Sequence, residues 1–342
     1  MTRRGSRRLD VAELVERARR GQPRAVARLI SLAEDGALPG GGGRSDTGGQ
    51  LREIAAALAA HSGRAQVIGL TGAPGVGKST SAAVLVSALR KAGERVGVLA
   101  VDPSSPFSGG ALLGDRIRMQ DHALDDGVFI RSMATRGHLG GVAGAAPQAL
   151  RVLDAAGCDV ILVETVGVGQ SEVEVISLAD TTLVLLAPGT GDGVQAAKAG
   201  ILEVADLLVV NKADRDGADR TVRDLEHMIT LGRHEQLGRC EQEGASWRPP
   251  IVRTVASTGV GADDVVDAIE QHRSWMVSRG ELDTRRARRA EAEIEAIALG
   301  QLHARFGAVR RGNALPDLAA RVVAGELDPY RAADHLVAEL GS

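Results

Sequence analysis

Short runs of apolar residues alternate with amphipathic stretches from residue 66 onward, and this alternation is the main structural signal in the chain. The runs are rich in Val, Ile and Leu and mostly unbroken, as parallel strands buried on both faces should be. The segments with this character are 66–71, 95–101, 127–131, 159–164, 181–187, 206–211 and 250–255. Strands alternating with helices predict an α/β fold, with a mostly parallel central sheet flanked by helices. Ligand-binding residues are then expected at the carboxyl ends of the strands.

Both ends of the chain have helical periodicity instead. Near the amino end, apolar residues at helical spacing predict helices within 9–32 and a further helix over 51–61. The many glycines between 36 and 49 indicate a flexible linker. We therefore interpret residues 1–62 as an N-terminal helical extension that precedes the strand-rich domain.

The carboxyl end is helical by pattern from residue 263. Residues 285–310 predict a long, highly charged helix with one narrow apolar stripe, formed by Ile294, Ile297, Leu302 and Phe306. Its basic start is interpreted as a solvated face. We interpret 281–342 as a helical dimerisation arm that packs on another subunit, with packing on the chain's own domain as the alternative. The strand-rich domain then spans 63–280.

Composition narrows the class of protein. The 342 residues are 44% hydrophobic but only 2% aromatic, so stacking of nucleic-acid bases on aromatic rings is not expected. A net charge of −3 also argues against nucleic acid as a partner. The two cysteines, Cys158 and Cys240, suggest neither a disulfide framework nor a metal site. Without a long apolar run or a signal sequence, we expect a cytoplasmic protein with no membrane partner.

The segment from Gly72 to Ser79, with the sequence GAPGVGKS, has the spacing G-x-x-x-x-G-K-[ST] of a phosphate-binding loop. It lies between a predicted strand and a predicted helix, which is the context this motif requires. Backbone N–H groups and the helix N-terminus can surround phosphate oxygens, and this involves Gly72, Ala73, Gly75, Val76 and Gly77. Lys78 would bridge the β- and γ-phosphates, and Ser79 would ligate Mg²⁺.

Two carboxylates follow predicted strands. Asp102 ends the second strand, where it can approach Mg²⁺ or an attacking water; the alternative is that it caps the turn before Pro103. Glu164 ends another strand and can hold Mg²⁺ through water or orient the hydrolytic water. The segment after Glu164 has a Gly-x-Gly pattern with Gly167, Gly169 and Gln170, and Gly167 can contact the γ-phosphate and move when that phosphate leaves. A second glycine-rich segment, 189–195, indicates a hinge.

The tetrapeptide N-K-A-D at 211–214 predicts guanine recognition. Asp214 can accept hydrogen bonds from guanine N1–H and N2–H₂, which adenine does not offer. Asn211 can either bond guanine O6/N7 or brace the loop, and the stem of Lys212 can lie along the base. Ser257 and Thr258 follow the last predicted strand and fit a second guanine-contacting loop.

The chain resembles the MeaB/ArgK-type GTPases, which are methylmalonyl-CoA mutase-associated chaperones of the SIMIBI class. The resemblance rests on these segments in this order: GAPGVGKST, VDPSSPFSGGALLGDRIRM, RSMATRGHLGGVA, ILVETVGVGQSE, APGTGDGVQAAKAGILEVAD and NKAD. It implies a homodimeric, Mg²⁺-dependent GTPase that binds GTP and GDP. Such a protein gates the loading of adenosylcobalamin into a cobalamin-dependent acyl-CoA mutase and protects or reactivates that enzyme.

The resemblance also implies residue roles. Thr80 would bind phosphate with Gly75, Gly77, Lys78 and Ser79. Asp115 would join Asp102 and Glu164 around Mg²⁺ and water, and Asp192 and Lys198 would act in a switch over 189–203. The chain departs from the family pattern in the glycines at 40–49, in 144–147, and in the loose guanine loop at 256–258.

Other readings fit the motifs less well. A nickel-insertion GTPase of the same class needs a Cys/His metal cluster, which the sequence does not offer. An ATPase or kinase for amino-acid transport conflicts with N-K-A-D and lacks a membrane segment. A protein-targeting GTPase would need a Met-rich domain, and the chain has five Met. We expect slow intrinsic GTP hydrolysis, because no residue is an obvious arginine finger.

Overall fold

The computed structural model describes residues 10–36, 47–103, 119, 122, 124–135, 141–165, 177–189, 204–237, 246–310 and 314–340. Its core is a seven-stranded parallel sheet with the strand order β3-β2-β4-β1-β5-β6-β7. The strands are β1 (Gln66–Thr71), β2 (Val96–Pro103), β3 (Val128–Thr135), β4 (Val160–Thr165), β5 (Thr181–Leu186), β6 (Leu207–Val210) and β7 (Ile251–Arg253). Each predicted strand segment overlaps one of them, so the predicted α/β fold is confirmed.

Most strand bounds differ from the prediction by one or two residues, and the carboxyl end of β3 differs by four. β3 continues to Thr135 because it pairs with β2 along its whole length, from Val96↔Val128 to Pro103↔Thr135. β7 ends at Arg253, since Val255 bridges to Val260 in the loop that follows. In both cases the partner backbone decides where the strand stops, and local residue preferences do not.

Alternate residues of each strand enter different cores, which explains the unbroken apolar runs. Val67 and Ile161 face the cluster formed with α1 (Val11–Arg19), α2 (Pro23–Gly36), α3 (Thr47–Leu58) and α6 (Gly141–Ala155); the short helix η2 (Ala59–His61) follows α3. Ile68 and Leu162 face the opposite cluster, with α4 (Lys78–Lys91) and α10 (Ala262–Arg279). A third cluster joins β5 and β6 to α9 (Ala218–Leu237).

The N-terminal helices belong to the first of these cores. Ile54 and Leu58 of α3 are fully buried. Arg131 of β3 donates to the Ser31 hydroxyl and the Glu34 carboxylate of α2, at 2.9 and 2.8 Å. The predicted linker is too long at its carboxyl end, because α3 already begins at Thr47; positions 37–46 lie outside the described residues.

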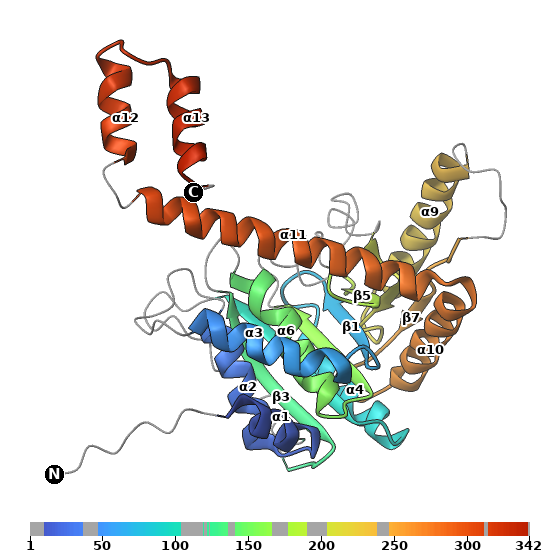
Figure 1. The fold of residues 1–342 in the computed structure, drawn as a ribbon. Helices are drawn as coiled ribbons and strands as arrows, with labels where there is room; N and C mark the ends of the chain where they lie inside the picture. The colour runs from blue at the N-terminus through green and yellow to red at the C-terminus, as the bar shows by residue number, and fades with distance from the viewer. Residues whose placement is uncertain are drawn as a thin grey trace.

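The long C-terminal helix α11 (Glu281–Arg310) runs across the body of the protein and leads to α12 (Ala314–Val323) and α13 (Pro329–Leu340) (Figure 1). The prediction that its basic start is a solvated face is wrong. Arg285, Arg286 and Arg289 form ion pairs with two buried carboxylates, Asp206 and Asp180, at the amino ends of β6 and β5. The first turns of α11 therefore pack on the chain's own domain.

Beyond these turns the apolar stripe of α11 is open to solvent. Ile294, Ile297 and Leu302 are 67%, 47% and 52% exposed in the single chain, and Phe306 is half-buried. Among the described helices, none is long and apolar enough to cross a membrane.

Candidate nucleotide site

The phosphate loop lies between the end of β1 at Thr71 and the start of α4 at Lys78. Two of its glycines have steric reasons to be glycine. A Cβ on Gly72 would lie 2.3 Å from the Leu185 carbonyl oxygen, and a Cβ on Gly77 would lie 2.5 Å from Asn211 Nδ2. Both also have positive φ angles, 143° and 99°. The phosphate loop is thus held close against β5 and against the predicted base-reading segment, residues 211–214.

Lys78 is buried, with 7% of its surface exposed. Its ammonium group donates to the carbonyl oxygens of Gly72 and Ala73, at 2.5 and 3.3 Å. The positive charge is therefore held within the loop, next to the amino end of α4, whose dipole adds to the attraction for anions. This is the arrangement that a phosphate-binding lysine requires.

Ser79 and Glu164 meet because β1 and β4 are neighbours in the sheet, with Leu70 opposite Glu164. The Ser79 hydroxyl donates to Glu164 Oε1 at 2.5 Å, and Glu164 is only 2% exposed. A hydroxyl and a carboxylate are oxygen ligands of the kind that Mg²⁺ prefers. The chemistry of these two residues therefore fits a magnesium ion, and binding of that ion here stays a prediction.

The rest of the described chain offers no richer metal site. No group of three or more His, Cys, Asp or Glu side chains suited to a metal is found within it. Cys158 is buried, and burial raises the pKa of its thiol to about 12. A magnesium ion held by one or two protein oxygens, with phosphates and waters as the other ligands, is consistent with this set.

Asp102 lies at the same edge of the sheet. It follows Val101, which is opposite Thr165 of β4, and its backbone pairs with Ala134 of β3. Its side chain is outside the described part of the chain, as are all atoms of several other predicted site residues: Asp115, Gly167, Gly169, Gln170, Asp192 and Lys198. The roles of these residues stay predictions.

Asn211 has the bracing role that the sequence left as one of two alternatives. Its Nδ2 donates to the Val76 carbonyl oxygen at 2.8 Å, and its Oδ1 accepts from Thr254 Oγ1 and Ala256 N, at 3.2 and 3.0 Å. The side chain is 2% exposed. It therefore joins the phosphate loop to the loop after β7.

Lys212 makes a second connection to the phosphate loop. Its ammonium group donates to the Gly75 carbonyl oxygen at 2.6 Å. Its φ of +57° is unusual for a residue with a side chain, and such a conformation persists where the surroundings hold it. Asp214 is exposed, and within the described residues it makes no hydrogen bond or ion pair. Its carboxylate is thus available to a guanine base.

The loop after β7 places Ser257 and Thr258 at the surface, where Thr258 Oγ1 donates to the Val255 carbonyl oxygen. The sequence did not reveal the parts played by Thr254 and Ala256. Thr254 lies just before the predicted guanine loop, and this position is the feature of the sequence that could have pointed to its role. Its hydroxyl and the Ala256 N–H fix the orientation of the Asn211 amide, since both donate to the same oxygen.

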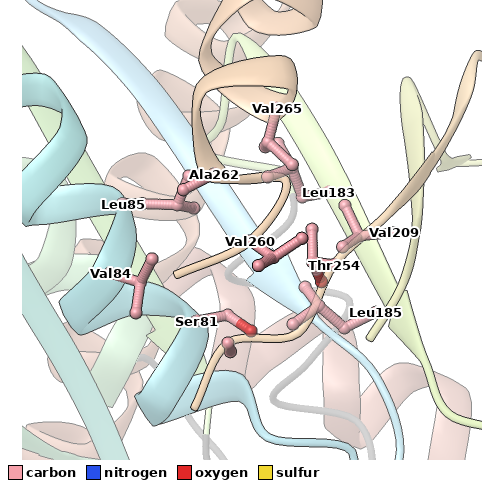
Figure 2. A pocket seen from close by; sticks show the side chains of 11 residues that line it. Ser81, Val84, Leu85, Leu183, Leu185, Val209, Thr254, Val260, Ala262 and Val265 are labelled. Atoms are coloured by element: carbon pink, nitrogen blue, oxygen red, sulfur yellow. The ribbon is translucent and has the colours of Figure 1, made fainter. Parts of the chain in front are cut away.

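An apolar cavity of about 20 Å³ lies between α4 and the segment 254–265 (Figure 2). It is lined by Val84 and Leu85 of α4, by residues of β5 and β6, and by Val260 and Val265. The volume is sufficient for about one water molecule, so the cavity is too small for a nucleotide. The Ser81 hydroxyl is buried at its edge and has no hydrogen-bond partner in the described part of the chain.

A sequence profile described as "Methylmalonyl Co-A mutase-associated GTPase MeaB" matches residues 26–310, which include all the motifs above. The chain belongs to the MeaB family. The resemblance inferred from the motifs is confirmed, and the interlocked phosphate and base-reading loops are those of a GTPase family. Guanine-nucleotide binding follows from this membership.

Named relatives agree with this assignment. A putative GTPase of Pyrococcus abyssi is 45% identical over 332 residues, covering 96% of this chain and 97% of its own. The GTPase ArgK of Escherichia coli is 36% identical over 80% of this chain and 78% of its own. The mouse protein named methylmalonic aciduria type A homolog, mitochondrial, is 36% identical over 79% of this chain and 64% of its own.

A solved structure has the same fold. The crystal structure titled LAO/AO transport system kinase matches this MeaB-family chain with a TM-score of 0.67 at 26% identity. The match covers 97% of this chain and 98% of the other. The overall fold is thus shared over nearly the full length of both proteins.

Proposed function

We propose that this chain is a GTP-hydrolysing chaperone of a cobalamin-dependent acyl-CoA mutase. In this role it gates the loading of adenosylcobalamin into the mutase and protects or reactivates that enzyme. Methylmalonyl-CoA mutase is the partner we favour, because the family description names it. One observation carries the GTP-dependent part: Asn211 and Lys212 bond directly to carbonyls of the phosphate loop, at Val76 and Gly75. The segment proposed to recognise the base and the loop proposed to bind the phosphates therefore form one structural unit.

The residues suggest a hydrolysis mechanism based on positioning and charge. Lys78 would move from the loop carbonyls to the β- and γ-phosphates as they bind. Ser79 and Glu164 would hold Mg²⁺, which neutralises charge that develops on the phosphates when it is bound. Either Asp102 or Glu164 would orient the attacking water. We expect the intrinsic rate to be slow, since a missing arginine finger costs about 10³–10⁵ in rate.

We further propose that the protein is a homodimer, with the exposed stripe of α11 in the interface. In the single chain an apolar stripe is open to water, formed by Ile294, Ile297 and Leu302. Exposed apolar surface of this kind marks interaction sites, and burial in an interface would remove the stripe from water. The ion pairs of Arg285, Arg286 and Arg289 hold the start of the same helix on the body, so the interface would be attached firmly to the GTPase domain.

The proposed function is tested by making the chaperone depend on a different nucleotide. Cofactor-free mutase is incubated with adenosylcobalamin and this protein, and recovery of mutase activity is followed with GTP, GDP or xanthosine triphosphate. The wild-type protein should respond to GTP. The Asp214→Asn variant should respond to xanthosine triphosphate instead, because an amide at this position pairs with the xanthine base.

The matched control is Asp216→Asn, which changes an exposed carboxylate two residues away and should keep the response to GTP. A Lys78→Ala variant should respond to neither nucleotide. If GTP, GDP and no nucleotide give the same recovery with wild-type protein, and no mutase complex forms with a GTP analogue, the chaperone function is wrong.

A further inference from the structure

A second cavity lies at the edge of the sheet opposite the phosphate loop. It has a volume of about 220 Å³ and lies between α6 and the start of α11, next to the amino ends of β1 and β5. Part of its wall is apolar, formed by Val67, Leu150, Ile161 and Leu178. For comparison, an engineered apolar cavity of about 150 Å³ binds benzene. This space is therefore large enough for a small organic molecule.

The carboxylates around this cavity have their hydrogen-bond partners within the chain. Asp180 is fully buried and accepts from Val67 N and from Arg286 and Arg289. Glu293 accepts two bonds from Arg151 and one from Gln148. Asp154 accepts from three consecutive backbone N–H groups, those of residues 63, 64 and 65. Few carboxylate oxygens around the cavity therefore remain to accept hydrogen bonds from a ligand.

The arginines around the cavity still have donors to offer. A guanidinium group has five N–H donors. Arg151 uses Nη1 and Nη2 on Glu293, and Arg289 uses Nη1 on the Leu178 carbonyl and Nη2 on Asp180. In the described residues neither Nε–H makes a bond. The cavity wall thus has N–H donors without an acceptor, and such donors favour a ligand that accepts hydrogen bonds, such as a carboxylate.

Net charge does not oppose such a ligand. Three arginines (151, 286 and 289) face three carboxylates (154, 180 and 293) around the cavity, so the wall is neutral overall. The wall thus offers an incoming carboxylate both N–H donors and apolar side chains. That combination matches a molecule with an anionic head and a short hydrocarbon tail.

We propose that this cavity is a second small-molecule site, which binds a short-chain carboxylate. The carboxylate group lies against Arg151 and Arg289, and the hydrocarbon tail contacts Leu150 and Leu178. Arg151 belongs to α6 and Arg289 to α11, so the bound molecule joins the start of the C-terminal arm to the GTPase domain. Occupancy therefore strengthens the attachment of the arm without involving the nucleotide site.

The test uses the full-length protein saturated with Mg²⁺ and GDP, so that the phosphate loop is filled and cannot bind the probe. Hexanoate is the probe, and 1-hexanol, which has the same tail without the charge, is the comparison. Binding is measured by saturation-transfer NMR and by calorimetry. We expect hexanoate to bind at least about tenfold more tightly than hexanol. Hydrogen exchange at the start of α11 should slow with hexanoate.

A pair of variants locates the site. Ala287 and Ala290 are both exposed on α11, but only Ala290 lines the cavity. Ala290→Phe should weaken hexanoate binding at least about tenfold, and Ala287→Phe should leave it unchanged within about twofold. Arg151→Lys keeps the charge but loses the planar donor group, and it should also weaken binding.

Three results would overturn the proposal. One is the absence of hexanoate binding to the wild-type protein. Another is equal binding of hexanoate and hexanol, which would show an apolar pocket without carboxylate recognition. The third is binding that persists in Ala290→Phe, which would place the probe elsewhere on the protein. Circular dichroism and GDP affinity of each variant confirm that it is folded.

Discussion

At the scale of single residues, Asn211 explains how base recognition is divided within the N-K-A-D segment. Its amide already has three partners in the chain, at Val76, Thr254 and Ala256. These bonds use both acceptor positions and one of the two N–H donors of the amide, so Asn211 holds the loops together and keeps one donor. We propose that discrimination of the base falls mainly on Asp214, which is exposed.

The first prediction concerns Asp214. Replacing it with Asn should lower GTP affinity on the order of 10- to 100-fold, because charge-assisted hydrogen bonds to the base are lost. Affinity for xanthosine triphosphate should rise at the same time. Competition against a fluorescent GDP analogue measures both changes, with Asp216→Asn as the control. Unchanged GTP affinity in Asp214→Asn would contradict the assigned base contact.

The second prediction concerns Glu164. In Glu164→Gln the side chain can still accept from the Ser79 hydroxyl but has no charge for Mg²⁺. We expect GTP turnover to fall on the order of 10²- to 10³-fold, with a higher Mg²⁺ requirement. Steady-state phosphate release across a Mg²⁺ titration measures this. Asp102→Ala should lower turnover as well if that residue orients the water; full activity in both variants would refute both roles.

At the scale of elements, α11 is where local pattern and structure disagree. The run RRARR at 285–289 is typical of a solvated helix face, yet three of its arginines pair with Asp180 and Asp206. The dipeptide Ala-Asp precedes both β5 and β6, and this repetition is the feature of the sequence that could have pointed to Asp180 and Asp206 as partners. The partners are about 80 to 110 residues apart in sequence, so the pairing depends on strand order.

The third prediction is a pH dependence of stability at Asp206. Burial alone would raise the pKa of Asp206, but the His272 ring, whose Nε2 lies 3.3 Å from Asp206 Oδ1, and the hydrogen-bonded Arg285 outweigh it and hold this pKa below its ordinary value. A carboxylate with a lowered folded-state pKa stabilises the fold above its unfolded pKa, near 3.9, and that stability is lost as pH falls through the folded pKa.

In Asp206→Asn this acid-dependent loss should disappear. The variant should be less stable than wild type at pH 7, and the difference should narrow below about pH 4. Urea unfolding followed by the fluorescence of Trp247 and Trp275 measures it, because both indoles lie beside His272. Asp334→Asn, exposed on α13, is the control. A constant difference between variant and wild type at all pH values would contradict the prediction.

At the scale of the whole molecule, α11 connects the GTPase domain to the α12–α13 pair (Figure 1). A 30-residue helix is about 45 Å long. Its first turns are held by ion pairs, while its later apolar residues are exposed. This division of one helix supports the proposed dimer, in which the later part of the arm meets a second copy.

The fourth prediction tests that dimer. A double variant, Ile294→Glu with Leu302→Glu, places charges in the proposed interface and should raise the dimer dissociation constant at least about tenfold. Light scattering after size-exclusion chromatography measures the mass. Leu124→Glu changes a side chain that is 96% exposed, far from α11 in sequence, and should remain dimeric. A monomeric wild-type protein, or an unchanged double variant, would refute the interface.

The sequence alone determined the fold class, the strand segments, the phosphate loop and the base-reading segment. These features are local: periodicity reports burial within one element, and each motif is a contiguous segment whose backbone supplies its own chemistry. Ser79 and Glu164 are 85 residues apart, yet their proximity was within reach for a different reason: both lie at the carboxyl edge of a parallel sheet.

Only the tertiary structure showed that Asn211 braces the loops, which carboxylates pair with the α11 arginines, and that a cavity lies beside Arg151 and Arg289. Each depends on which distant segments become neighbours. Strand order and register set these neighbours through packing of the whole sheet, and residues that lie more than 100 positions apart carry no local record of it.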